Sequence, residues 1–120
     1  MRGKMMDRQR LVGGWLSLMD ALEHADRFIE GAQKNSAKAT DMLEAIHYLR
    51  VAQVNLEAGG KDSRAISGFA AALARNADEL ENSAYSTMGG GSLLTTRDIS
   101  GRMERLLVEL RKEIDRIHSH

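Results

Sequence analysis

The chain has no cysteine and no proline among its 120 residues. Without cysteine it forms no disulfide, no cysteine-ligated zinc site and no thiol nucleophile, which suits a reducing cytoplasm. Aromatic residues make up only 4% of the chain although 42% of it is hydrophobic. The apolar mass is therefore Ala, Leu, Ile, Val and Met, a composition typical of packed helices.

An excess of charge of one sign is also lacking, since 17 basic residues balance 17 acidic ones. A nucleic-acid binder needs a positive surplus on some face, so no nucleic-acid partner is expected. No apolar run approaches the roughly 20 residues that a membrane span needs. The basic start followed by LVGGWLSLM is only a crude likeness to a signal peptide, because Asp7 interrupts the basic region. We therefore expect a cytoplasmic protein, bacterial in type, with no membrane contact.

Apolar residues recur every three or four positions, which is the spacing of one face of a helix. The pattern predicts four helices, over residues 6–33, 37–58, 63–86 and 96–118. In the first helix the predicted core stripe is Leu11, Trp15, Leu18, Leu22, Ala25, Ile29 and Ala32. Strand signals are absent. The sequence therefore predicts a single all-α domain over residues 1–120, an antiparallel four-helix bundle whose core is complete alone or is completed by homodimerisation.

Turn residues separate the first three predicted helices. Asn35 or Ser36 is expected to cap the second helix by accepting backbone N–H bonds. Gly59 and Gly60 are expected to end that helix in the left-handed conformation, which glycine adopts at little cost.

The longest predicted connection is the glycine-rich stretch 86–96, with no element of its own. Thr95 and Asp98 fit a capping box at the start of the last helix. Gln53 falls in the apolar seam of the second helix, where a buried amide would fix the register of packing.

A single histidine, His47, lies in the middle of the second helix. At about 100° per residue, it projects about 140° from the centre of that helix's core stripe. Tyr48, Val51 and Val54 share the outer half of the helix with it. The sequence therefore predicts an accessible histidine bordered by apolar residues that a monomer has no reason to expose.

The residues around this histidine, AIHYLR at 45–50 and LEAG at 56–59, resemble histidine-containing phosphotransfer domains. These are four-helix bundles of this length in which an exposed mid-helix histidine relays phosphate between receiver domains. The resemblance implies His47 as phosphoacceptor and Arg50 as the cation that screens phosphate charge, in place of the family's lysine. Val51 stands where the family has glycine.

The sequence gives little support for a metal site or a phosphate-binding loop. Glu44 and His47 have the Glu-x-x-His spacing of di-iron bundles, but no second copy follows and the pair projects outward. The glycine-rich stretches lack the lysine and serine spacing of a phosphate-binding loop. Charged residues four apart, Asp98 with Arg102 and Arg111 with Asp115, fit ordinary surface pairs. We therefore expect no enzyme activity, no metal and no cofactor.

The first helix also carries surplus apolar surface. Val12 and Met19 flank its core stripe and Leu16 projects about 140° away from it. Gly13 and Gly14 within this run weaken the helix by about 1 kcal/mol each relative to alanine. They suggest a helix start that is frayed or is wrapped by the 86–96 loop, or else close approach of another backbone.

Two apolar outer patches on one small bundle predict a protein partner. The expected function is that of a non-enzymatic regulator, such as an anti-activator, adaptor or chaperone, which masks a surface of a client protein and is itself a homodimer. The alternative is a phosphorelay protein acting through His47 and Arg50. The candidate partner-binding residues are Leu11, Val12, Trp15, Leu16, Met19, Tyr48, Val51 and Val54.

Overall fold

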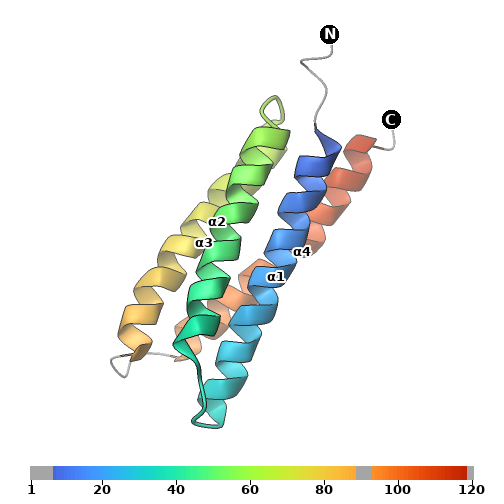
Figure 1. The fold of residues 1–120 in the computed structure, drawn as a ribbon. Coiled ribbons are helices and arrows are strands. Elements are labelled where there is room, and N and C mark those ends of the chain that lie inside the picture. Colours follow the sequence, from blue (N-terminus) through green and yellow to red (C-terminus); the bar gives the residue numbers. More distant parts are fainter. Residues whose placement is uncertain (1–6, 89–92, 119–120) are drawn as a thin grey trace.

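The computed structural model describes residues 7–88 and 93–118, and the side chains of residues 7–83 and 95–118. Its four helices are α1 (Arg8–Gln33), α2 (Ala39–Gly59), α3 (Arg64–Met88) and α4 (Leu93–His118). Sequential helices run antiparallel, and α4 packs against α1 to close the bundle (Figure 1). The prediction of an all-α four-helix bundle is confirmed.

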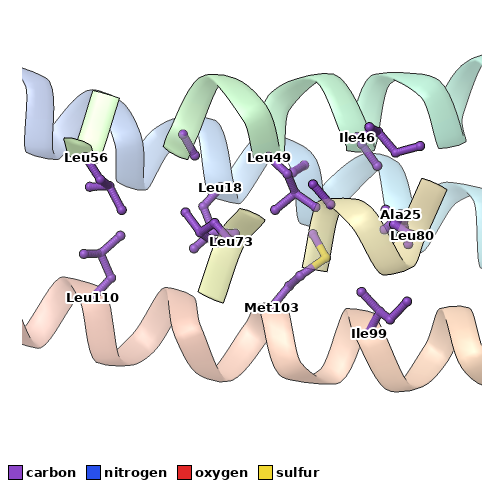
Figure 2. Close-up of a cluster of buried hydrophobic side chains, with 14 of the residues drawn as sticks. Leu18, Ala25, Ile46, Leu49, Leu56, Leu73, Leu80, Ile99, Met103 and Leu110 are labelled. Carbon is purple, nitrogen blue, oxygen red and sulfur yellow. The ribbon is translucent and has the colours of Figure 1, made fainter. Parts of the chain in front are cut away.

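Small apolar and long aliphatic side chains from all four helices form one core. Figure 2 shows side chains from each helix pointing into the shared interior. Fully buried members include Leu11, Leu18, Ala25, Leu49, Leu56, Leu73, Leu80, Met103 and Leu110. Burying side chains of this kind contributes roughly 1.5–3 kcal/mol each before the entropy cost of ordering the chain.

The buried face of α1 is broader than the predicted stripe. Gly14, Ala21 and Phe28 are buried, whereas Trp15 and Leu22 are only half-buried. The reason is that α1 packs against both α2 and α4, so its core face spans two interfaces. On the side of α1 that faces α2, small residues let α1 and α2 approach closely.

The predicted register role of Gln53 is wrong. Leu49, Ala52 and Leu56 fill the core side of α2, and Gln53 is turned to the edge of that face. Its Nε2 donates a hydrogen bond of 3.2 Å to Glu57 on the same helix. The amide therefore links two turns of α2 and does not reach another helix.

The predicted loop over 86–96 is too long. Helix α3 continues to Met88 and α4 begins at Leu93, so only residues 89–92 lie between them, outside the described residues. Thr95 consequently lies within the first turn of α4 and not at its cap. The buried hydroxyls of Ser83 and Thr96 share a hydrogen bond of 2.9 Å that joins the two helices near this connection.

Asn35 ends α1 and does not begin α2. Its φ of 57° lies in the left-handed region, which asparagine tolerates better than most residues. The Ser36 N–H donates to the Gly31 carbonyl at 2.6 Å, and the Asn35 N–H donates to the Ala32 carbonyl at 3.3 Å. These bonds satisfy the last carbonyls of α1. The cap of α2 is Lys38, which makes no side-chain capping bond.

The two glycines at the end of α2 are needed for the space that they leave and not for the left-handed conformation that we expected. Gly60 has a φ of −125°, which any residue adopts. A Cβ on Gly60 would lie 2.3 Å from Cγ2 of Ile66, and one on Gly59 would lie 2.7 Å from Cβ of Arg10. Both glycines are therefore needed for close approach of α1 and α3 to this turn.

Ion pairs cover the outer faces. The expected pairs Asp98–Arg102 and Arg111–Asp115 are present at 3.3 Å and 3.5 Å. Arg102 also reaches across to Glu79 at 2.8 Å, and this hydrogen bond raises the pKa of Arg102 above its ordinary value against the lowering effect of burial. Such solvent-exposed pairs contribute about 0–1 kcal/mol each.

Candidate protein-binding surface

The outer side of α2 carries an apolar stripe in addition to the side that faces the core. Its members are spaced by four, four, three and four residues, which aligns them on one face of a helix. We call this the α2 stripe, and it consists of Leu43, His47, Val51, Val54 and Ala58. Leu43 and Val54 are 57% and 58% exposed, so the bundle does not bury them.

The α2 stripe is exposed because the core side of α2 is already occupied. Met42, Leu49 and Leu56 are buried there, together with Ala45 and Ala52, which bring α1 close. The stripe lies on the opposite side of the same helix, with Val51 and Ala58 half-buried at its margin. Helix α2 is thus apolar on two sides, a pattern typical of a helix with partners on both.

His47 is exposed, as the helical projection predicts, but its neighbour Tyr48 is half-buried. The ring of Tyr48 contacts His47 edge-on, with 5.3 Å between centroids. It stacks on His24 of α1 at 5.7 Å, and Nδ1 of His24 lies 3.1 Å from Oδ1 of Asp41. Tyr48 therefore covers the seam between α1 and α2, and is not the outward-pointing anchor that we expected.

Arg50 lies beside His47 but is engaged elsewhere. Its Nη2 donates to Oδ1 of Asp78 at 2.9 Å and to Oε1 of Glu81 at 3.2 Å, both on α3. These two carboxylates neutralise the guanidinium. A phosphate on His47 would have to compete with them for this cation.

Two carboxylates flank the α2 stripe. Glu44 and Glu57 are exposed, and neither forms an ion pair with another residue in the described part of the chain. The stripe therefore presents an apolar centre with acidic margins.

A second exposed apolar area lies on α1. Leu16 is 45% exposed and Met19 is 38% exposed, with Val12 half-buried beside them. We call these three residues the α1 patch. Val12 and Leu16 also line a hollow of about 510 Å³ on this side of the helix.

The predictions for two candidate partner-binding residues on α1 are wrong. Leu11 is fully buried, so it has no surface to offer a partner, because its place in the core stripe takes precedence. Trp15 is half-buried: its Nε1 donates to the Leu107 carbonyl at 2.9 Å, and Arg111 covers its ring at 5.1 Å. Trp15 thus joins α1 to α4 within the chain.

The close approach that we inferred from Gly13 and Gly14 occurs inside the molecule. A Cβ on Gly14 would lie 2.7 Å from Cδ2 of Leu56 and 3.3 Å from the Ala52 carbonyl oxygen. A Cβ on Gly13 would make only ordinary contact with Asn55. Gly14 therefore allows close packing of α1 against α2. Neither a frayed start of α1 nor the approach of another molecule is needed to explain this glycine.

Sequence reasoning missed two exposed apolar residues. Leu43 lies four residues before His47, so the helical spacing that identified Val51 and Val54 would also have found it. Val108 on α4 is 50% exposed and stands apart from the α2 stripe.

No group of three or more His, Asp or Glu side chains in the described part of the chain is arranged to hold a metal ion. Among residues 7–88 and 93–118, no helix combines the length and apolar character that a membrane crossing requires. Comparison with known proteins adds no relative, since no protein-family model, curated protein or solved structure matches this chain.

Proposed function

We propose that this chain is a small cytoplasmic regulator of bacterial type that acts by binding another protein and catalyses no reaction. The observation that supports the proposal is the α2 stripe, an apolar face on a helix whose other face already fills the core. From Leu43 to Ala58 it extends over about 22 Å, or about four helical turns.

The partner that fits this surface is an amphipathic helix of a client protein. Residues spaced by three and four present an apolar seam that another helix can cover along its length. Glu44 and Glu57 on the margins favour a client helix with lysine or arginine beside its apolar residues. Burial of each large apolar member contributes roughly 1.5–3 kcal/mol before the cost of association. A client helix held this way is masked from its other partners.

The α1 patch provides a place for a second copy of the chain. We propose that Leu16 and Met19 contact the same residues of a second protomer, while the α2 stripe of each protomer stays open for the client. Size-exclusion chromatography with light scattering at micromolar concentration is expected to give twice the chain mass, and Leu16→Glu is expected to give a monomer. A strict monomer for the unchanged chain would remove the homodimer from the proposal.

The client-binding proposal is tested by Val54→Glu. This change puts a carboxylate in the middle of the α2 stripe, where a docked apolar helix would have to desolvate it, so affinity is expected to fall about tenfold or more. A photoreactive residue at position 43 identifies the client by crosslinking, and titration with the purified client measures the affinity.

The matched control is Val108→Glu, the same substitution at a similarly exposed residue on α4. It is expected to leave client affinity unchanged. Equal affinity of the Val54→Glu variant and the original chain, with helical content intact, would contradict the assignment of this surface.

Histidine phosphotransfer is the second candidate, because His47 is exposed in the middle of α2. The test incubates the chain with a phosphorylated receiver domain and measures acid-labile, alkali-stable phosphate, with His47→Gln as control. Label on His47 is the result expected of a relay. Since Asp78 and Glu81 already hold Arg50, we expect no label.

A further inference from the structure

A groove of about 600 Å³ lies between α3 and α4, on a different face from the α2 stripe. Phe69, Ala72 and Leu106 supply its apolar lining, and all three are half-buried. The volume is in the range of pockets that hold small molecules. Charged side chains surround this apolar surface.

The acidic side chains at the groove already have cationic partners. The three carboxylates that line it are those of Asp78, Glu79 and Glu109. Asp78 pairs with Arg50 at 2.9 Å, Glu79 with Arg102 at 2.8 Å, and Glu109 with Lys112 at 3.6 Å. Their negative charge is therefore largely compensated within the bundle.

Two arginines at the groove have no such partner. Arg75 and Arg105 line it and are exposed, and neither forms an ion pair with any described residue. The contacts Ser83–Thr96 and Glu79–Arg102 fix an antiparallel register that places position 75 of α3 level with position 105 of α4. Two like charges at the same level of one groove repel, and an anion bound there relieves that repulsion.

A buried amide at the same place also lacks a partner. Asn76 is only 4% exposed and lines the groove, yet its side chain makes no hydrogen bond within the described residues. Among the described residues, the sealed side-chain atoms without a partner are Arg102 Nε and His118 Nε2, so solvent reaches the Asn76 amide and leaves it open to a ligand in the groove. The amide offers two N–H donors next to Arg75.

We propose that this groove binds a small amphiphilic carboxylate. The apolar body of the ligand lies against Phe69 and Leu106, and its carboxylate sits between the guanidinium groups of Arg75 and Arg105. The Asn76 amide donates a further hydrogen bond to a carboxylate oxygen. The planar guanidinium groups match the geometry of a carboxylate, and the apolar lining excludes water from one side of the contact. This site is separate from the α2 stripe and does not depend on the proposed protein client.

The experiment uses decanoate, below its micelle concentration, as the probe and decanol as the neutral analogue of equal chain length. Calorimetric titration of the full chain is expected to show one decanoate site, with decanol at least tenfold weaker. Arg105→Gln and Arg75→Gln are each expected to weaken decanoate binding about tenfold, since each removes a charge-assisted contact. Arg97→Gln on α4, an exposed arginine that does not line the groove, is the matched control and is expected to bind as the original chain does.

Asn76→Ala keeps both arginines and removes only the amide, so it is expected to weaken decanoate several-fold and leave decanol unaffected. Circular dichroism of each variant checks that the helices are intact. The proposal would be overturned by no binding of decanoate at millimolar concentration, by equal binding of decanol, or by an equal loss in the Arg97→Gln variant. Retention of full affinity by both Arg75→Gln and Arg105→Gln would place any bound decanoate outside this groove.

Discussion

Leu49→Ala is expected to lower the free energy of unfolding by about 3 kcal/mol. The Leu49 side chain is fully buried at the middle of α2, where side chains from the other helices meet it (Figure 2). Truncation removes buried apolar contacts and leaves a cavity that a bundle of regular helices closes only in part. Guanidinium denaturation followed by circular dichroism measures the loss as a lower midpoint with an unchanged slope.

Val54→Ala is the control on the same helix. Val54 is 58% exposed, so its truncation is expected to change stability by less than about 0.5 kcal/mol. Comparison of Leu49→Ala with Val54→Ala thus measures how much the buried side and the exposed side of α2 each contribute to stability. Comparable losses in the two variants would mean that Val54 is buried in the molecule as it exists in solution, for example by a second copy of the chain.

Gly60→Ala is expected to destabilise the bundle by about 2 kcal/mol. The new Cβ would lie 2.3 Å from Cγ2 and 2.7 Å from Cβ of Ile66, and a branched side chain in the first turn of α3 has little freedom to move aside. Gly60 follows the end of α2, so alanine brings no compensating gain in helix propensity. Thermal unfolding of the variant is expected at a lower midpoint.

Gly68→Ala is expected to change the stability of the bundle in the opposite direction. Gly68 lies within α3 and a Cβ there would meet no atom within 4 Å. Alanine is therefore expected to stabilise the bundle by about 0.5–1 kcal/mol through helix propensity alone. Stabilisation by both substitutions would show that the turn around Ile66 is looser than the structure has it.

Periodicity was sufficient to predict the fold, because apolar residues three and four apart admit few alternatives to a helix. It also predicted correctly that His47 and Val54 face outward, since Met42, Leu49 and Leu56 define the core side of α2 without ambiguity. Tyr48 shows the limit of the method. A large ring at the edge of a helix can lie over the neighbouring interface, and the ring of Tyr48 does so by stacking on His24 of α1.

The glycines show a second limit. The sequence predicts a turn at Gly59 and Gly60, and a frayed start or an external contact at Gly14. In the structure, a Cβ at each of these positions would come too close to a side chain of a neighbouring helix. The sequence does not reveal such distances. The stretch 86–96 is likewise predicted as a connection without an element of its own, whereas α3 continues to Met88 and α4 begins at Leu93.

The chain contains one tryptophan, and its environment makes it a built-in optical probe. The indole of Trp15 is held by the Leu107 carbonyl and covered by the Arg111 guanidinium, so its emission reports whether α1 and α4 remain in contact. Neither the α2 stripe nor the α3–α4 groove includes this residue. Fluorescence of the unlabelled chain therefore follows the contact between α1 and α4 at a residue that lies outside both proposed binding places.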